Sequence, residues 1–358
     1  MVECDLAGIE SFGIESHPFV YKIGQAKLSW KLDPKDLKEA SDKLLKKASS
    51  LKPKQKEYPD LINKCYPPTT LEKLTTLKEA WLKCNENPEI TNMLWFMITS
   101  ILRKTSPVGT ASWQYVLPNK SKAKTVDPYI AFQAKASEIL NDMRIMQKRY
   151  TKIGNSEILK EDARKMDSVP NQWADLIITS PPYANNYDYG DATRLEMTFW
   201  GDIEKYGDLQ EVVRKNLIVS CTQHATKKRA EIESHLDSSA IRPIVSELKP
   251  IYDQLCEVRL TKGGKKNYQL MMLAYFHDMA LVFKELRNKT KRNSEMCFVI
   301  GDSAPYGVYM PVDKWLGDLA IANGFKDYSF EKLRDRNVKW KNRKHRVPLK
   351  EGRLWIKG

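Results

Sequence analysis

A run of apolar residues that ends in two consecutive prolines constrains the fold of this chain more than any other segment. Residues 173–179 read Trp-Ala-Asp-Leu-Ile-Ile-Thr, and residues 180–183 read Ser-Pro-Pro-Tyr. A short apolar run bounded by proline predicts a buried β-strand. Because proline fixes φ and lacks an N–H, the strand must end there and the following turn is rigid. We therefore expect the end of a buried strand to present a hydroxyl, two fixed carbonyls and an aromatic ring.

Predicted strands and helices alternate in the second half of the chain. The expected strands are 156–159, 175–179 and 296–300, the expected helices are 270–287 and 312–322, and 328–334 and 353–356 form an expected antiparallel pair. Residues 209–251 are polar and predict further helix. Strands that alternate with helices indicate an α/β fold with a doubly wound, mostly parallel sheet.

The first 150 residues predict one short strand and then mostly helices. The strand is 11–15, and the helices are 19–30, a helix that begins at Pro34, 70–82, 93–102 and 131–150, with an irregular stretch at 105–115. Asp33 followed by Pro34 is a typical helix start, because aspartate caps the first turn and proline suits the first helical position. Residues 31–150 therefore read as a helical insertion.

The composition indicates a soluble, basic protein. Its mean hydropathy is -0.54, and no apolar run approaches the roughly 20 residues that span a membrane, so we expect a cytoplasmic protein without membrane contact. The six cysteines form no Cys-x-x-Cys pair, so we expect reduced thiols and no metal site. The formal charge of +14 favours a polyanionic partner, although an inert basic surface would carry the same charge.

The segment Thr179-Ser180-Pro181-Pro182-Tyr183 resembles motif IV of the amino-group DNA methyltransferases. These enzymes methylate the exocyclic nitrogen of cytosine or adenine with S-adenosylmethionine. Serine at the first motif position is similar to the form common in cytosine-N4 enzymes of restriction-modification systems, whereas adenine-N6 enzymes more often carry aspartate. The resemblance covers most of residues 8–30 and 100–358, and it implies a Rossmann-like methyltransferase sheet.

The resemblance implies catalytic roles for the four motif residues. The Ser180 hydroxyl and the Pro181 carbonyl would accept hydrogen bonds from the target amine, and Pro182 would keep the turn rigid. Tyr183 would stack on a base turned out of the duplex. A plain strand end or a polyproline ligand is the alternative, but an exposed ligand would not follow a buried strand.

Residues 185–196 look like the downstream stretch of one subgroup of modification enzymes. Asp188, Tyr189, Arg194 and Glu196 are candidates to line the substrate site. A salt-bridge network within a loop is an equally good interpretation of these four residues.

Two acidic residues near the ends of predicted strands match cofactor-binding positions in the resemblance. Glu15 would hold the ribose hydroxyls, and Asp162, with its neighbour Ala163, would bind the adenine. His17 is better explained as a capping or packing histidine.

The glycine-rich cofactor loop of the family is missing from this sequence, which contains no Gly-x-Gly. One explanation is circular permutation, with residues 297–303 acting as the loop, although that stretch lacks the glycine spacing. The explanation that we favour is a split enzyme, in which a second polypeptide supplies the first strand and the loop. A fragment of a longer protein would have the same sequence.

Four basic runs are candidates for contacts with double-stranded DNA, namely 120–124, 227–229, 262–266 and 339–346. In the last run Lys339, Arg343 and Arg346 are interleaved with aromatic side chains, which suits an opened duplex. A solvated face is the alternative for each run.

In terms of the resemblance the chain divides into five parts. These are a partial cofactor-binding segment (1–30), a helical insertion that could recognise the target (31–150), the catalytic core (151–200), a basic helical insertion that could also contact DNA (201–268) and the C-terminal half of the core (269–358).

Three functional classes remain open. The first is a DNA amino-methyltransferase, with cytosine N4 favoured over adenine N6. The second is an RNA or protein methyltransferase, which usually carries asparagine in place of Ser180. The third is a non-catalytic DNA-binding subunit. Cytosine-C5 methylation is disfavoured, because it requires a cysteine nucleophile after a proline and the chain has no Pro-Cys dipeptide.

Overall fold

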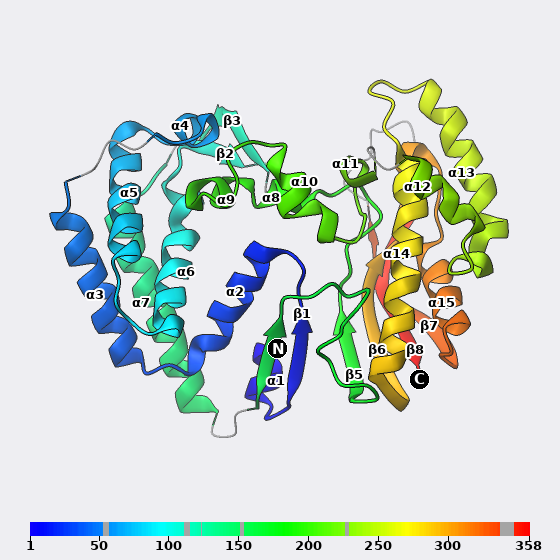
Figure 1. Cartoon of the computed structure of the whole chain (residues 1–358), viewed down its shortest axis with the longest axis horizontal. Helices are drawn as coiled ribbons and strands as arrows, with labels where there is room; N and C mark the ends of the chain where they lie inside the picture. The colour runs from blue at the N-terminus through cyan, green and yellow to red at the C-terminus, as the bar shows by residue number, and fades with distance from the viewer. Residues whose placement is uncertain (53–56, 111–114, 123, 151–153, 226–228, 337–346) are drawn as a thin grey trace. The chain divides into compact units, whose positions relative to one another are not determined.

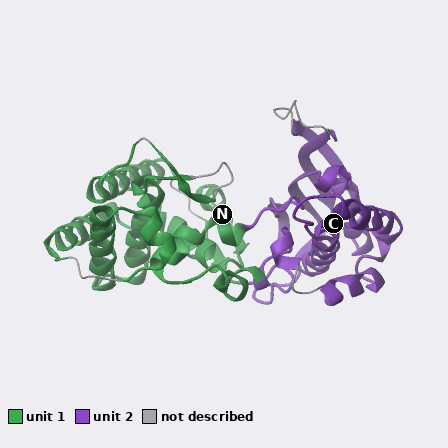
Figure 2. Ribbon diagram, turned by 90° about the horizontal axis from the view of Figure 1, so that it is seen from above, with its two compact units in different colours: residues 1–160, 189–214 green, residues 161–188, 215–358 purple. Residues whose placement is uncertain are grey.

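The computed structural model describes the whole chain except residues 53–56, 111–114, 123, 151–153, 226–228 and 337–346 (Figure 1). The described residues form two compact units (Figure 2). Unit 1 comprises residues 1–160 and 189–214, and unit 2 comprises residues 161–188 and 215–358. The chain therefore passes from unit 1 to unit 2, returns directly after the residues that follow the double proline, and enters unit 2 again.

Unit 1 is mainly helical. Its helices are α1 (Val2–Leu6), α2 (Pro18–Leu28), α3 (Pro34–Ser50), α4 (Asp60–Cys65), α5 (Pro68–Leu82), α6 (Pro88–Thr105), α7 (Pro128–Arg149), α8 (Tyr189–Ala192), α9 (Arg194–Trp200) and α10 (Asp208–Val212). Its strands are β1 (Ser11–Ile14), β2 (Val108–Thr110), β3 (Val116–Ser121) and β4 (Ser156–Leu159). β1 and β4 pair in parallel, whereas β2 and β3 form an antiparallel pair.

Three long helices of unit 1 begin in the same way. An aspartate or asparagine immediately precedes a proline at Asp33, Asn87 and Asp127, and each side chain accepts a hydrogen bond from a backbone N–H of the first turn. The proline occupies a position whose N–H would have no partner inside the helix. The starts of α3, α6 and α7 are therefore determined locally, and the apolar faces of these helices and of α5 then pack into one core. This core includes Leu37, Leu74, Leu77, Ile98 and Phe132.

Unit 2 contains a four-stranded mixed sheet in the order β5-β6-β8-β7. The strands are β5 (Ala174–Thr179), β6 (Thr290–Gly301), β7 (Asp327–Arg336) and β8 (Leu349–Lys357), and the helices are α11 (Thr222–Ala225), α12 (Arg229–Glu233), α13 (Val245–Leu260), α14 (Tyr268–Lys289) and α15 (Val312–Ala322). β5 pairs with β6 in parallel, while β8 is antiparallel to both β6 and β7. β5 is therefore an edge strand within this sheet.

Helices α14 and α15 pack on one face of the unit 2 sheet. Phe283 of α14 lies 5.4 Å from Phe298 of β6, measured between ring centroids, and Phe276 of α14 lies 5.0 Å from Trp315 of α15. Side chains alternate between the two faces of a strand. Ile178 of β5 is opposite Cys297, the residue before Phe298, so it lies on the other face.

That second face is not covered at β5. The side chains of Leu176 and Ile178 share it, because they are two residues apart, and they are 54% and 71% exposed. A doubly wound sheet requires helices on both faces. Unit 2 therefore has an open strand edge and an exposed apolar surface at the same strand.

Most of the expected elements are confirmed. The closing antiparallel pair is β7 with β8, α14 and α15 occupy the expected helical segments, and Gly324 follows α15 with a φ of 92°.

Other segments differ from the expectation. Residues 105–115 were expected to be irregular, but they include β2. Residues 209–251 were expected to be helical, and the described ones form short helices, 3-10 turns and the first part of α13. The described strands form three separate sheets with both parallel and antiparallel pairs instead of one mostly parallel sheet. None of the described helices is long and apolar enough to cross a membrane.

The contact between α15 and β7 supplies a stability prediction. A Cβ atom at Gly317 would lie 2.4 Å from the ring of Tyr328, whose hydroxyl donates a hydrogen bond to Asp318 at 2.9 Å. Gly317→Ala should lower the free energy of unfolding by about 1–3 kcal/mol through overpacking, despite a gain in helix propensity of about 1 kcal/mol. Chemical denaturation measures this change. Gly207→Ala is the matched control, because a Cβ atom there meets nothing within 4 Å.

Candidate functional site

The double-proline turn begins where β5 ends beside β6. Thr179 is the last residue of β5 and is paired with Phe298. Ser180 is exposed, whereas Pro181 is buried. The Ser180 hydroxyl donates a hydrogen bond to the carbonyl of Val299 at 3.3 Å. A hydroxyl that donates its single proton retains lone pairs that can accept hydrogen bonds. Ser180 is therefore oriented as an acceptor toward any further partner.

One face of the Tyr183 ring is covered by Arg336, at the end of β7. The guanidinium carbon lies 5.1 Å from the ring centroid, and Nη1 donates to the Asp302 carbonyl at 2.8 Å. A Cβ atom at Gly301 would lie 2.6 Å from that Nη1 and 3.1 Å from the Tyr183 ring. Glycine at 301 therefore allows this close approach. Burial raises the pKa of Tyr183 and Glu351 adds to the increase, while Arg336 and a side-chain hydrogen bond with Ser180 oppose it, so the phenol is neutral near neutral pH.

Hydrogen bonds fix the loop that follows the Ser-Pro-Pro-Tyr motif. Ser303 donates to the Ala184 carbonyl. Asn186 has a φ of 67°, a left-handed conformation that asparagine adopts more readily than most residues. Its side-chain oxygen accepts from both the N–H and the hydroxyl of Thr222, each at 2.9 Å. The loop is thus attached to the segment that contains α11.

Asp188, at the end of this loop, is buried. Its residue is 3% exposed, and one carboxylate oxygen lies 3.6 Å from Nε2 of His224. A direct contact with DNA would require this carboxylate to become exposed.

Asp162 belongs to a partly buried charge network in unit 2. Arg164 binds both of its carboxylate oxygens at 2.6–3.0 Å. The same arginine donates through Nη1 to Asp278 at 2.8 Å. The backbone N–H of Arg164 also donates to Asp162, at 2.9 Å. Three N–H groups therefore use most of the roughly four acceptor positions of the carboxylate, and one position is left for a further amino group. Ala163 lies between the paired residues and is half-buried.

Glu15 follows β1 in unit 1, just before α2. Its Oε1 accepts from the N–H of His17 at 2.7 Å. Burial raises the pKa of Glu15, and hydrogen bonds from the backbone of His17 and Ser16 oppose this increase. His17 caps α2 through Nδ1, which accepts from Phe19 N–H at 3.2 Å. The interpretation of His17 as a capping histidine is confirmed.

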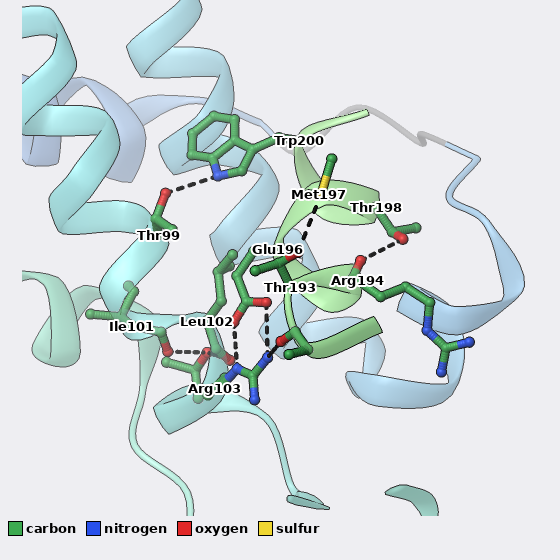
Figure 3. Close-up of polar contacts among 12 residues, drawn as sticks. Thr99, Ile101, Leu102, Arg103, Thr193, Arg194, Glu196, Met197, Thr198 and Trp200 are labelled. Atoms are coloured by element: carbon green, nitrogen blue, oxygen red, sulfur yellow. Dashed lines mark hydrogen bonds and ion pairs between the residues drawn. The ribbon is translucent and has the colours of Figure 1, made fainter. Parts of the chain in front are cut away.

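The expected salt bridges are present among the residues around α9 (Figure 3). Arg103 contacts both carboxylate oxygens of Glu196, at 2.5 and 3.0 Å. Arg194 pairs with Asp191 at 3.1 Å. Tyr189 is 40% exposed. Glu196 and Arg194 thus have structural partners within unit 1, in agreement with the alternative interpretation of this segment.

The candidate residues are divided between the two units. Glu15, Tyr189 and Arg194 belong to unit 1, whereas the double-proline turn, Asp162 and Asp188 belong to unit 2. Within unit 2 the structure brings together Ser180, Tyr183 and Arg336, and of these the sequence did not point to Arg336. Lys339, Arg343 and Arg346 lie outside the described residues.

Part of the chain is similar to type II methyltransferases. The type II methyltransferase M.BsoBI of Geobacillus stearothermophilus is 26% identical over 192 residues, which are 50% of this chain and 37% of that protein. The type II methyltransferase M.AvaI, from a Nostoc species and from Anabaena variabilis, is 31% identical over 153 residues, which are 42% of this chain and 30% of the relative. The chain thus spans about a third of the length of these curated relatives. No protein-family model and no solved structure matches it.

The raised pKa of Glu15 predicts a pH-dependent stability. A carboxyl group with a raised pKa in the folded state stabilises the fold below its ordinary value of 4.5, and this stability is lost as the pH rises through the folded-state pKa. Glu15→Gln removes the ionisation. The free energy of unfolding of the variant should therefore exceed that of the wild type at pH 7.5, and this difference should be smaller at pH 4.5. Urea denaturation at the two pH values measures this, with the exposed Glu10→Gln as control; equal gains at both pH values would contradict it.

Proposed function

We propose that this chain is the catalytic subunit of a site-specific DNA methyltransferase of a restriction-modification system. It transfers a methyl group from S-adenosylmethionine to the exocyclic amine of a base turned out of the duplex, with cytosine N4 as the favoured target. The observation that carries the proposal is the Ser-Pro-Pro-Tyr turn at the carboxyl end of β5. Similarity to type II methyltransferases over about half of the chain and the net charge of +14 support it.

The hydrogen bonds of Ser180 fit the role of an acceptor. Its proton is donated to Val299, so its lone pairs can accept an N–H of the target amine. The Pro181 carbonyl, at a position where φ is fixed, would accept the second N–H. Two acceptors draw the nitrogen lone pair out of conjugation with the ring and direct it at the methyl group. S-adenosylmethionine would supply the methyl group, with its carbon–sulfur bond breaking as the nitrogen–carbon bond forms, and the amine proton would pass to solvent. The contribution of this chain is mainly positioning.

The rigid environment of Tyr183 suits a stacking platform. Arg336 lies against one face of the Tyr183 ring. This contact fixes the position of the ring before a base binds. Arg336 also adds positive charge beside the motif, where the phosphates of a strand would pass. In the proposal Asp188, Tyr189, Arg194, Lys339, Arg343 and Arg346 are the further candidates for contact with double-stranded DNA.

Glu15, Asp162 and Ala163 are the proposed cofactor residues. A ribose diol offers two O–H donors, and hydrogen bonds from these donors would favour the charged form of the buried Glu15 carboxylate. Asp162 is fixed by Arg164 and retains acceptor capacity for the amino group of adenine. Each carboxylate, considered within its own unit, therefore has the chemistry to bind one part of S-adenosylmethionine.

We propose further that a second polypeptide supplies the glycine-rich loop together with a strand that pairs with β5. The chain has no Gly-x-Gly. Among the described strands of its sheet, β5 pairs with β6 alone, and Leu176 and Ile178 are exposed on the face of β5 that the described helices leave uncovered. An added strand would satisfy the open edge, and the helix after a glycine-rich loop would cover the apolar side chains.

Methyl transfer tests the proposed reaction. Labelled S-adenosylmethionine and duplex DNA are incubated with this chain and the product of its neighbouring gene. Ser180→Ala should reduce the rate at least about 100-fold, as for removal of one group that stabilises a transition state. The exposed Ser239→Ala is the matched control and should retain activity.

Mass spectrometry of digested nucleosides separates cytosine N4 from adenine N6. Transfer of label to RNA or protein but not to DNA would overturn the assigned substrate class. A Ser180→Ala variant as active as the wild type would overturn the role of the turn.

Cofactor titration tests the second polypeptide. Calorimetry should show little binding of S-adenosylmethionine to this chain alone and clear binding to the complex. The double variant Leu176→Asp/Ile178→Asp should fail to form the complex while remaining folded by circular dichroism. Leu260→Asp is the control, because Leu260 is 65% exposed on α13, away from β5 in the sequence. Full cofactor affinity of the chain alone would sink this part of the proposal.

A further inference from the structure

Three buried side chains with metal-binding chemistry meet beside the loop that follows the double-proline turn. They are Asp188 at the end of that loop, Cys221 just before α11, and His224 within α11. One ligand atom from each residue lies within 4.8 Å of the others. The three residues are 3%, 0% and 4% exposed, and all belong to unit 2.

The imidazole of His224 is buried, and its hydrogen-bonding capacity is not used by the described residues. Its side chain is 1% exposed, and neither Nδ1 nor Nε2 has a hydrogen-bond partner among the described residues. Buried polar groups are nearly always hydrogen-bonded, and an unsatisfied one costs about 1–3 kcal/mol. An imidazole with two unsatisfied nitrogens in a protein interior therefore requires an explanation.

The separation of His224 and Asp188 fits two ligands of one metal ion. Nε2 and the carboxylate oxygen are 3.6 Å apart, which is too long for a hydrogen bond. Two ligand atoms about 2.1 Å from a tetrahedral zinc ion lie about 3.4 Å from each other. A contraction of a few tenths of an ångström would bring this pair to ligand geometry.

The donor set selects the kind of metal. A cysteine thiolate, an imidazole and a carboxylate suit zinc, whereas calcium and magnesium prefer oxygen ligands alone. On binding, the Cys221 thiol would release its proton to solvent and the thiolate would coordinate the ion.

We propose that Asp188, Cys221 and His224 bind one zinc ion, which fastens the loop after Tyr183 to the α11 segment. The backbone already joins these two segments, because the N–H of Asn186 donates to Ser220 at 3.0 Å and the Ser220 hydroxyl donates to Tyr187 at 3.2 Å. The ion would add a stronger connection to these two hydrogen bonds and to the two that Asn186 accepts from Thr222. This zinc site requires neither cofactor nor DNA, and a zinc-bound Asp188 would replace the DNA contact considered for this residue above.

The test measures metal in the full chain, purified without chelator. Elemental analysis should find one zinc per chain, and cobalt(II) in its place should give a thiolate-to-cobalt charge-transfer band. Cys221→Ser should abolish the band, and His224→Gln should weaken zinc binding by more than roughly 100-fold, the upper range for removal of a group that only supports a ligand. Cys256→Ser, a half-buried cysteine of α13, and His235→Gln should bind the metal like the wild type.

A second measurement needs no variant. Because zinc would bind the folded state and stabilise it, added zinc should raise the melting temperature of the metal-stripped wild type. No bound zinc together with no shift in melting temperature would overturn the proposal. Equal binding by the wild type, Cys221→Ser and His224→Gln would overturn it as well, because the metal would then lie elsewhere.

Discussion

The parallel pairing of β5 with β6 is the contact on which the rest of the candidate site depends. It places Ser180 beside the Val299 carbonyl and brings the end of β6, at Gly301, against the Tyr183 ring. Because Gly301 has no side chain, Arg336 can reach across from β7 and cover that ring. A shift of β5 by one residue would turn every side chain to the other face and remove this arrangement.

The charges of the two candidate cofactor residues, Asp162 and Glu15, are balanced in different ways. In unit 2, Arg164 lies between Asp162 and Asp278, and Asp278 also accepts from the N–H of Val219 at 3.0 Å, so each buried charge has partners. In unit 1, burial raises the pKa of Glu15, and its hydrogen bonds come from backbone N–H groups alone. A charge that the fold leaves poorly compensated is typical of a position where a ligand completes the environment.

Local signals in the sequence predicted the helices better than the sheets. Asp33 with Pro34 predicted α3, and the apolar run before Ser180 predicted β5, because capping and strand termination depend on adjacent residues. β2 and the separation into three sheets were not predicted, because strand pairing joins segments distant in the sequence. The cysteine spacing argued against a metal site, yet Cys221 and His224 meet Asp188, which lies more than thirty residues earlier. Spacing rules detect only ligands that are close in sequence.

The sequence by itself determined the Ser-Pro-Pro-Tyr turn and its place at the end of a strand, because proline geometry and the apolar pattern act over a few residues. The burial expected for that strand was wrong, since Leu176 and Ile178 of β5 are exposed. It also showed that the given sequence contains no Gly-x-Gly, because such a pattern is read directly from the order of the residues. Only the tertiary structure decided which groups surround the turn. Arg336, Gly301 and the cluster around His224 come from other elements, and only pairing and packing between distant segments bring them to Ser180, Tyr183 and Asp188.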